Sequence, residues 1–340
     1  MPKAVSIKDV ARLAGVSPTT VSHALGGGRP VAEATRERVR EAAARLQYRP
    51  HPGARSLKAT RTGVLGMCVM NVTDIVGPLA EMEYYFRLVS AATAAAMDER
   101  FALVVVPETQ AGEFWDRLLL DGAIIADPQH DDPSIRRLQA RGLPVVTIGR
   151  NPDAPDEGYW VDSDPEAATR LILDHLAARG ARHIAGVTFL TSDYWTQACL
   201  RTYHAWCAER GRQPLVEIAS GVSDGDLRDA ATRLLDADPR PDAVYGFYEL
   251  PALSLLTVAT ERGVAVPGEL MVAASSDFGL GATATPPMTT LDYHPEQLAH
   301  DAAHMLVDLV RGHTPTEPRA LVRASLTERE STRRRASSGS

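Results

Sequence analysis

The chain of 340 residues lacks the features of exported and membrane proteins. It contains no apolar run of about eighteen residues, the length that a membrane helix needs. The N-terminal Met1-Pro2-Lys3-Ala4 is not followed by the apolar core of a signal peptide. Its three cysteines, Cys68, Cys199 and Cys207, form no CxxC pair, and the last two would lie roughly 12 Å apart on a helix, too far for a disulfide. We therefore expect a soluble protein with reduced thiols in the cytoplasm.

Acidic residues are scarce at the start of the chain. Residues 1–63 carry 12 Lys and Arg against 4 Asp and Glu, a net charge of +8, whereas the rest of the chain carries a net charge of −15. Acids would be interspersed with bases on an ordinary solvated surface. The imbalance therefore favours a polyanionic partner for this segment.

The same basic segment has the pattern of a short helix, a tight turn and a second helix. Apolar residues recur at i, i+3, i+4 and i+7 from Ile7 to Ala14, and Ser6 is placed to cap that helix. Gly15 supplies the backbone that a tight turn needs. Ser17 and Pro18 then suit the cap and first turn of a second helix. A third helix is predicted over residues 34–46.

The second helix has polar side chains on its outer face. Val21 and Leu25 are expected to face the core of the three helices. The outward residues would read DNA base edges with hydroxyl, methyl and imidazole groups, and they are Pro18, Thr19, Thr20, Ser22 and His23. A helix-turn-helix pattern alone is a weak signal, and the basic charge of the segment strengthens it.

Longer stretches of the chain carry a specific resemblance. They are Ser6-Ile7-Lys8-Asp9-Val10-Ala11-Arg12-Leu13-Ala14-Gly15-Val16-Ser17, Thr20-Val21-Ser22-His23-Ala24-Leu25, Tyr48-Arg49-Pro50, Ala54-Arg55-Ser56-Leu57-Lys58, Asp121-Gly122-Ala123-Ile124-Ile125, Asp162-Ser163-Asp164 and Pro287-Met288-Thr289-Thr290. With these runs the chain resembles the lactose repressor/galactose repressor (LacI/GalR) family of transcriptional regulators. One departure is Ala32, where the family usually has a capping serine, so the start of the third helix is expected to fray.

The resemblance implies further DNA contacts on either side of the second helix. It implies a hinge helix that orders on DNA when paired with its twin, with Leu57 wedged into the minor groove. The hinge contacts would come from Ala54, Arg55, Leu57 and Lys58, and the phosphate contacts from Ser6, Ser17, Arg29 and Arg61. A piece this short does not hold helical form by itself. The alternative is a flexible linker with an incidental leucine.

Beyond residue 62, apolar runs of strand length alternate with helical patterns. Strands are predicted over residues 64–70, 103–106, 123–126, 145–148, 184–190, 216–219, 243–247 and 271–275. Helices are predicted near 79–99, 111–120, 133–141, 165–179, 195–210, 225–237, 251–262 and 295–311. This alternation indicates parallel sheets that are covered by helices on both faces. Two such doubly wound sheets in tandem resemble the periplasmic-binding-protein fold.

The expected organisation is an all-α helix-turn-helix head joined by a hinge helix to an α/β core. The head spans residues 1–49, the hinge or linker 50–62 and the core 63–330. Within the core, an N-subdomain takes about 63–160 plus 293–325 and a C-subdomain about 161–292. The polar, basic tail of residues 331–340 is expected to be disordered.

A ligand cleft is expected where the carboxyl ends of the two sheets meet. The candidate ligand-binding residues lie just after the strands or in the helix that follows, and they are Asn71, Thr73, Asp74, Asp127, Trp195, Arg201, Phe247, Glu249 and Asp277. Carboxylates accept hydrogen bonds from sugar hydroxyls and aromatic faces stack on sugars. In the family an arginine of the helix after Trp195 grips the effector. Here Cys199 holds that position, with Arg201 nearby, and Glu249 replaces an aspartate.

Two motifs raise the alternative of an enzyme. A nucleophile elbow between a strand and a helix fits the run Gly221-Val222-Ser223-Asp224-Gly225. A role of Ser223 as a helix cap accounts for the same residue. His300 and His304 have the i, i+4 spacing of a zinc helix, without an evident third ligand. Gly26-Gly27-Gly28 lacks the Lys-Ser/Thr of a phosphate loop and reads as a turn.

The sequence therefore predicts an effector-responsive DNA-binding regulator, and a repressor in particular. It is expected to bind a pseudo-palindromic operator as a homodimer, because one small head buries too little surface for tight specific binding. The expected effector is a sugar or related metabolite, with no cofactor, metal or membrane partner and no catalysis. The alternative is a soluble sugar-binding or sugar-processing enzyme with a DNA-binding tether.

Overall fold

Three helices build the first unit of the chain, in a computed structural model that describes residues 5–26, 30–48, 61–69, 79–276 and 279–333. Helix α1 spans Ile7–Ala14, α2 Pro18–Gly26 and α3 Glu33–Arg45. Val10, Val21 and Val39 are fully buried where the three helices meet. Residues 1–62 and 63–340 form separate compact units. The predicted hinge lies mostly outside the described residues.

Local sequence signals account for the ends of the first two helices. Gly15 adopts a left-handed backbone with φ 66°, and its amide donates to the Ala11 carbonyl, which ends α1. The hydroxyl of Ser17 accepts a hydrogen bond from the Thr20 amide at 3.0 Å and so caps α2. Ala32 makes no side-chain cap at the start of α3, in keeping with the absence of the capping serine.

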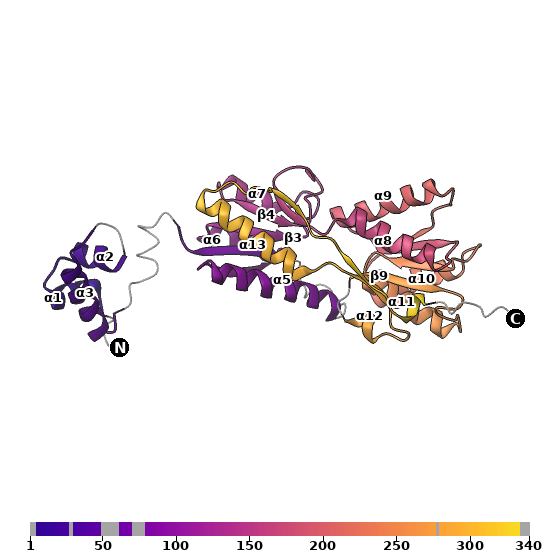
Figure 1. The fold of residues 1–340 in the computed structure, drawn as a ribbon, viewed down its shortest axis with the longest axis horizontal. Coiled ribbons are helices and arrows are strands. Elements are labelled where there is room, and N and C mark those ends of the chain that lie inside the picture. The colour runs from indigo at the N-terminus through magenta and orange to yellow at the C-terminus, as the bar shows by residue number, and fades with distance from the viewer. Residues whose placement is uncertain (1–4, 27–29, 49–60, 70–78, 277–278, 334–340) are drawn as a thin grey trace. The chain divides into compact units, whose positions relative to one another are not determined.

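The second unit contains two six-stranded sheets, each covered by helices on both faces (Figure 1). The first sheet has the strand order β11-β5-β4-β3-β1-β2, and all of its pairs are parallel. Its strands are β1 (Val64–Val69), β2 (Ala102–Pro107), β3 (Gly122–Ala126), β4 (Val145–Ile148), β5 (Tyr159–Asp162) and β11 (Arg319–Leu321). Helices α5 (Leu79–Asp98) and α13 (Pro295–Arg311) pack on one face, and α6 (Glu108–Arg117) and α7 (Pro133–Ala140) on the other.

The second sheet repeats this plan with one antiparallel edge. Its order is β12-β10-β9-β8-β6-β7, and only β12 runs antiparallel to its neighbour. The strands are β6 (Ile184–Phe189), β7 (Val216–Ala219), β8 (Ala243–Gly246), β9 (Met271–Ser275), β10 (Thr289–Asp292) and β12 (Ser325–Thr327). Helices α8 (Pro165–Ala178) and α9 (Tyr194–Glu209) cover one face, α10 (Asp224–Leu235) and α11 (Glu249–Glu261) the other, and the short α12 (Leu280–Thr283) precedes β10. The predicted fold class of two doubly wound α/β subdomains is confirmed.

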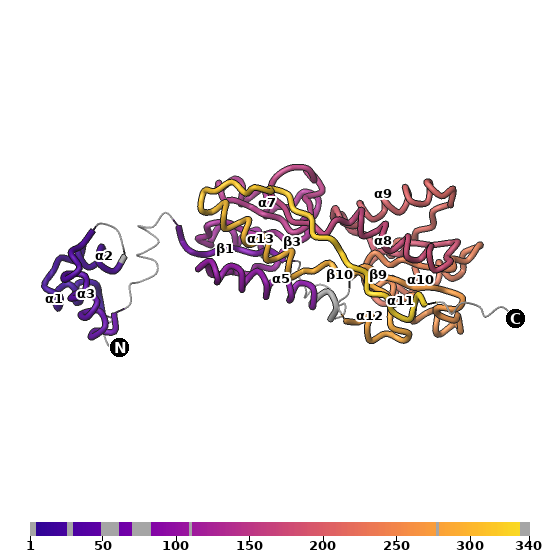
Figure 2. Tube along the Cα trace, in the orientation of Figure 1, coloured from indigo at the N-terminus to yellow at the C-terminus, as the bar shows by residue number. Residues whose placement is uncertain are grey.

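The chain crosses between the two sheets three times, after β5, after β10 and after β11, and its last part can be followed in Figure 2. Val161 and Asp162 belong to β5 of the first sheet, so the predicted subdomain boundary after residue 160 is two residues early. Helix α6 begins three residues earlier than predicted, with Pro107 in the N-cap position, and it ends three residues earlier because Leu118 has extended backbone.

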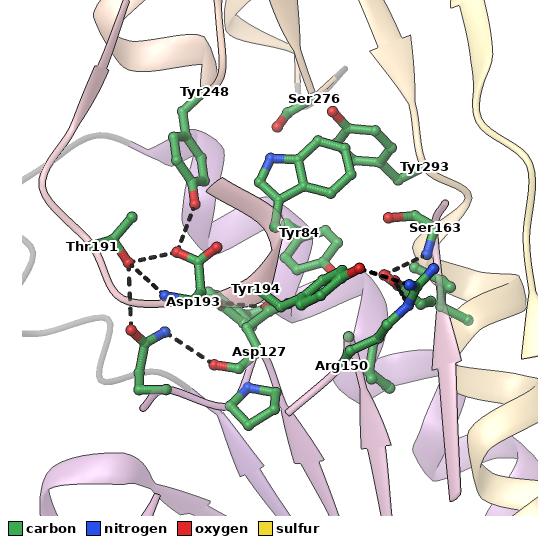
Figure 3. Close-up of a pocket in the computed structure, with 18 of the residues that line it drawn as sticks. Tyr84, Asp127, Arg150, Ser163, Thr191, Asp193, Tyr194, Tyr248, Ser276 and Tyr293 are labelled. Carbon is green, nitrogen blue, oxygen red and sulfur yellow. Dashed lines mark hydrogen bonds and ion pairs between the residues drawn. The ribbon is translucent and has the colours of Figure 1, made fainter. Parts of the chain in front are cut away.

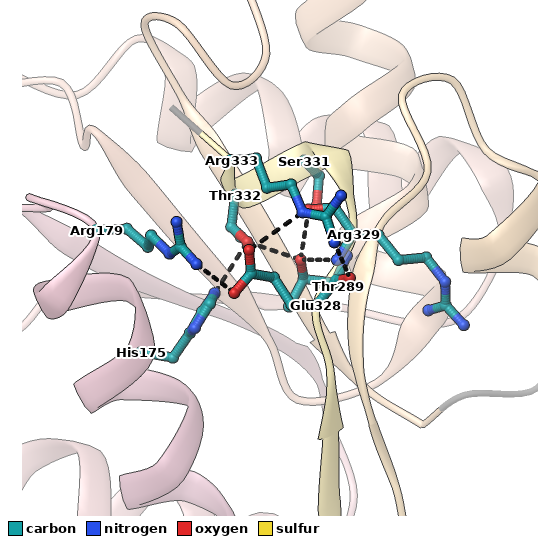
Figure 4. A network of polar contacts seen from close by, with 8 residues as sticks. All are labelled: His175, Arg179, Thr289, Glu328, Arg329, Ser331, Thr332 and Arg333. Carbon is teal, nitrogen blue, oxygen red and sulfur yellow. Dashed lines mark hydrogen bonds and ion pairs between the residues drawn. The ribbon is translucent and has the colours of Figure 1, made fainter. Parts of the chain in front are cut away.

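The predicted disorder of the tail is wrong for its first three residues. Ser331 and Thr332 are buried in a short 3-10 helix, Glu330–Thr332, that packs against the second sheet (Figure 4). The Ser331 hydroxyl accepts a hydrogen bond from the Thr289 amide and donates to the Val272 carbonyl. These backbone groups belong to the neighbouring strands β10 and β9, so the hydroxyl bridges the two strands at the start of their pairing. Polarity alone predicts solvation and misses such a role.

Candidate functional site

The predicted DNA-reading residues lie on an accessible side of α2. Pro18 and Thr19 are exposed, whereas Thr20, Ser22 and His23 are half-buried. Of the predicted phosphate contacts, Ser6, Ser17 and Arg61 are exposed. The Asp9 carboxylate accepts hydrogen bonds from both the amide and the hydroxyl of Ser6. Other predicted DNA contacts lie outside the described residues, namely Arg29, Ala54, Arg55, Leu57 and Lys58.

In the second unit, a cavity of about 390 Å³ lies where loops after the strands of the two sheets meet (Figure 3). Aromatic side chains make up only 6% of the chain, yet seven line this cavity. They are Tyr84, Tyr85, Phe189, Tyr194, Trp195, Tyr248 and Tyr293. Trp195 meets Tyr293 edge to face with ring centroids 4.6 Å apart, and Tyr248 stacks on Phe189 at 4.5 Å. The cavity thus presents broad apolar faces of fixed orientation.

Asp193 organises the side of the cavity that belongs to the second sheet. It precedes α9 and caps it, with its carboxylate accepting the Thr196 amide at 2.7 Å. The same carboxylate accepts hydrogen bonds from the Thr191 hydroxyl at 2.5 Å and from the Tyr248 hydroxyl at 3.1 Å. Because the carboxylate is buried and so fully engaged, it holds the Tyr248 ring in place over the cavity.

Asp127 and Gln129 extend from β3 toward that side. The Asp127 backbone is left-handed with φ 49°, and its carboxylate accepts a hydrogen bond from the Tyr85 hydroxyl at 3.0 Å. The Gln129 amide nitrogen donates to the Asp127 carbonyl, and its side-chain oxygen accepts from the Ser192 hydroxyl at 3.1 Å. Gln129 therefore links the two sheets across one rim of the cavity.

Arg150 links the two sheets across another part of the lining. It follows β4, and its Nε lies 2.9 Å from Oδ2 of Asp162 in an ion pair within the first sheet. Its Nη1 donates to the Tyr194 hydroxyl at 2.8 Å, and Tyr194 in turn donates to Glu166 at 2.8 Å. Tyr194 and Glu166 belong to helices of the second sheet, so a chain of charged and polar groups spans the cleft.

Burial raises the pKa of two groups in this network. Desolvation raises the pKa of Asp162 to about 6, and the neighbouring Arg150 guanidinium only partly opposes it. Burial, and then the hydrogen bond to Glu166, raises the pKa of Tyr194 to about 12. The Tyr194 hydroxyl therefore stays protonated at neutral pH and remains a donor.

Three of the predicted ligand-binding residues line the cavity, namely Asp127, Trp195 and Glu249. Two others do not. The Phe247 ring is fully buried under the sheet, and Arg201 is exposed outside the lining. Cys199 is buried and cannot grip a ligand. Asn71, Thr73, Asp74 and Asp277 lie outside the described residues.

Sequence reasoning missed Arg150, Asp193 and most of the tyrosines. Arg150 and Asp193 each follow a strand. The position after a strand is also the criterion that selected the predicted ligand-binding residues, so it could have identified these two. Tyr248 comes directly after Phe247, and alternation along an extended chain decides which of the two rings faces the cavity. Tyr84 and Tyr85 lie within α5, which a search limited to strand ends does not reach.

The residues that suggested catalysis have structural roles. The Ser223 hydroxyl accepts the Asp226 amide at 3.2 Å and caps α10, which leaves it engaged within its own turn. The rings of His300 and His304 lie 4.3 Å apart and are tilted by 54°, beside Asp301 and Glu99, on a surface of α13. Within the described ranges, no group of three or more His, Cys, Asp and Glu side chains could hold a metal ion.

No helix among the described residues is both long and apolar enough to cross a membrane.

The raised pKa of Asp162 predicts a pH dependence of stability. A carboxyl whose pKa is higher in the folded state contributes stability that is full below its unfolded value near 3.8 and is lost as pH rises through about 6. Asp162→Asn should remove this contribution. Urea unfolding at pH 4 and pH 7 should therefore show the variant gaining stability relative to the wild type at the higher pH. A difference between the two proteins that does not change with pH would contradict the assignment.

Residues 6–51 match the family model "Bacterial regulatory proteins, lacI family", and residues 173–332 match "Periplasmic binding protein-like domain". The chain is 28% identical over 336 residues to the HTH-type transcriptional regulator CelR of Thermobifida fusca, covering 96% of this chain and 98% of that protein. It is 27% identical over 323 residues to the HTH-type transcriptional repressor PurR of Aliivibrio salmonicida, covering 90% and 92%.

Two solved structures have a similar fold. A CelR–cellobiose complex has a TM-score of 0.73 at 27% identity and covers 96% of this chain and 99% of its own. A lac repressor dimer bound to operator and the anti-inducer ONPF has a TM-score of 0.81 at 24% identity, covering 97% and 99%, and this likeness is one of fold. With both units matched and the relatives aligned over almost their whole length, the chain belongs to the lacI (LacI/GalR) family of bacterial transcription regulators.

Proposed function

We propose that this regulator is a repressor that binds operator DNA as a homodimer and is switched by a sugar or related metabolite in the cavity. The observation that carries the proposal is the cavity lining, in which aromatic faces alternate with carboxylates between the two sheets. The protein would act in the cytoplasm, because operator DNA lies in that compartment. The proposal assigns no catalytic step, so a bound effector should be recovered chemically unchanged.

The DNA-binding part of the proposal is supported by the surface of α2. Ser17 fixes the start of the helix, so that exposed Thr19 and half-buried His23 lie on neighbouring turns. Their hydroxyl, methyl and imidazole groups suit base edges in a major groove. The net charge of +8 in residues 1–63 supplies the sequence-independent attraction to phosphates.

For the head, we expect His23→Ala and Arg61→Ala to have different effects on DNA binding. His23→Ala should change the ranking of operator variants, since a base-reading contact is worth about 1–3 kcal/mol of discrimination. Arg61→Ala should weaken binding to all sequences alike. Fluorescence anisotropy with a set of operator variants and random DNA measures both. An equal loss of affinity for operator and random DNA in His23→Ala would refute its base-reading role.

The sugar-binding part is supported by the chemistry of the lining. Carboxylates accept hydrogen bonds from hydroxyl groups, and aromatic rings stack on the C–H face of a sugar. The Tyr248 hydroxyl is fixed by Asp193 and the Trp195 ring by Tyr293, so both groups are positioned before a ligand arrives. The relative CelR has been solved as a complex with cellobiose, which makes cellobiose the first sugar to test.

Trp195→Ala should remove most of the affinity for the effector. Loss of one stacking face predicts a decrease of about tenfold or more, with operator binding unchanged in the absence of sugar. Thermal shift over a panel of neutral sugars, beginning with cellobiose, identifies the ligand, and calorimetry then measures the affinity. Trp115→Phe is the matched control, because Trp115 is buried under the first sheet away from the cavity. Equal effector affinity in Trp195→Ala and the wild type would count against this site.

The homodimer is supported by an exposed apolar stripe on α5. Phe86 and Met97 are 75% and 66% exposed, and eleven residues place them on the same side of the helix, three turns apart. Val105 of β2, the neighbouring edge strand, is also exposed. Exposed apolar side chains beside a sheet edge suit a contact between two copies of the chain.

Phe86→Lys should convert the dimer into a monomer and weaken operator binding, because one head buries too little surface for tight specific binding. Light scattering coupled to gel filtration reports the mass. Leu171→Lys replaces an apolar residue of α8 that is also exposed, and it serves as the control. If Phe86→Lys is still a dimer at micromolar concentration, the dimer interface does not include this side of α5.

A further inference from the structure

Arg150 is the only cationic side chain among the described residues that line the cavity. Its side chain is 13% exposed, and its guanidinium lies over the rings of Trp160 and Tyr194, 4.8 Å from each centroid. Packing between two rings fixes the plane of the guanidinium and limits its rotamers. The group is therefore positioned as a rigid donor at the cavity wall.

Two carboxylates cancel the charge of this guanidinium. Nε of Arg150 lies 2.9 Å from Asp162, and Nη2 lies 3.7 Å from Glu166. A guanidinium has five N–H donors, and the contacts to Asp162, Glu166 and the Tyr194 hydroxyl do not use all of them. Arg150 therefore has donor capacity for a ligand but no net charge to offer with it.

The rest of the lining adds negative charge. Its other ionisable carboxyl groups belong to Glu108, Asp127, Asp193 and Glu249. An anionic ligand in this cavity would be repelled by these groups and would find no uncompensated cation among the described lining residues. An uncharged polyol would meet acceptors from the carboxylates and donors from Arg150.

A second arginine near the same ring provides a comparison. Arg201 of α9 lies 5.3 Å from the Tyr194 centroid and 4.0 Å from Glu166. Its side chain is 56% exposed and lies outside the cavity lining. Two guanidiniums thus contact one tyrosine and one glutamate, and only Arg150 reaches the cavity.

We infer that Arg150, presented from the first sheet, grips a hydroxyl of the effector, and that its cancellation by Asp162 and Glu166 restricts the cavity to uncharged ligands. Sugar phosphates and sugar acids are excluded. This inference rests on the proposed sugar-binding function and adds the specificity-determining residue. It also assigns a role in selectivity to Glu166. This residue contacts Arg150 and Tyr194 but is not among the cavity-lining residues.

The first experiment compares arginine variants of the full-length protein. The probes are the neutral sugar with the largest thermal shift in the panel and its 6-phosphate. The wild type should bind the phosphorylated sugar at least about a hundredfold more weakly. Arg150→Met should weaken binding of the neutral sugar by about tenfold or more, as expected for loss of a charged hydrogen-bond donor. Arg201→Met should leave it unchanged.

The second experiment separates a ligand contact from a purely structural role. Single-deoxy analogues of the neutral sugar should include one that binds the wild type and Arg150→Met with equal affinity, because its missing hydroxyl is the one that Arg150 contacts. Glu166→Gln should raise the affinity for the 6-phosphate relative to the neutral sugar by about tenfold, since it uncovers part of the guanidinium charge. Glu209→Gln, which breaks a surface pair with Arg170 between α8 and α9, is the control and should not change this ratio.

Distinct results would overturn the two proposals. If no neutral or charged sugar shifts the melting temperature, the proposed function fails. If sugars bind but the wild type accepts the 6-phosphate as well as its parent, or if Arg150→Met weakens every deoxy analogue by the same factor, the proposed function stands and the inference about Arg150 is wrong. An unchanged selectivity in Glu166→Gln would equally reject charge cancellation as the cause of specificity.

Discussion

The buried pair of Arg150 and Asp162 is the constraint around which the second unit is arranged. A charge taken out of water is costly unless a partner of opposite charge and further hydrogen bonds accompany it. Arg150 stands after β4 and Asp162 ends β5, where the chain leaves the first sheet for the second. Satisfying the arginine requires Tyr194 and Glu166 from the second sheet, so the pair is complete only when the two subdomains face each other as they do here.

The three crossovers limit how those subdomains can move. Asp162, Asp292 and Leu321 each end a strand from which the chain passes to the other subdomain. Because three connections join the same two subdomains, any change in their relative position must bend all three. Ser331 and Thr332 anchor the segment that follows β12 to the second sheet through buried hydrogen bonds with Thr289.

The sequence predicts the main elements well where their signal is long and periodic. The apolar spacing of α1 and the buried runs of β1, β3 and β9 leave little alternative to a helix or a parallel strand. Strands β5, β10, β11 and β12 were missed because they are three or four residues long and their pairing is decided by the crossovers. Local sequence carries no information about that pairing.

The cavity was predictable in position and only partly in composition. Strand ends locate it, since the carboxyl ends of parallel strands meet there, and Asp127, Trp195 and Glu249 were found in that way. Which side chain enters the cavity depends on tertiary contacts. Phe247 turns into the core while Tyr248 is held over the cavity by Asp193. Arg150 follows β4 and so meets the same criterion, but its own segment does not reveal that Asp162 and Tyr194 surround it.

The connection between the cavity and the first unit depends on β1. Residues 62 and 63 lead into this strand, and the Gly63 amide donates to the Asp121 carboxylate at 2.7 Å while the Asp121 amide donates to the Val64 carbonyl at 2.9 Å. Strand β1 lies between β2 and β3, and its other end points toward the cavity edge of the sheet. A strand paired on both sides moves as a rigid body with its sheet. A closure that displaces the first sheet at the cavity must therefore also displace Gly63, where the chain enters the second unit.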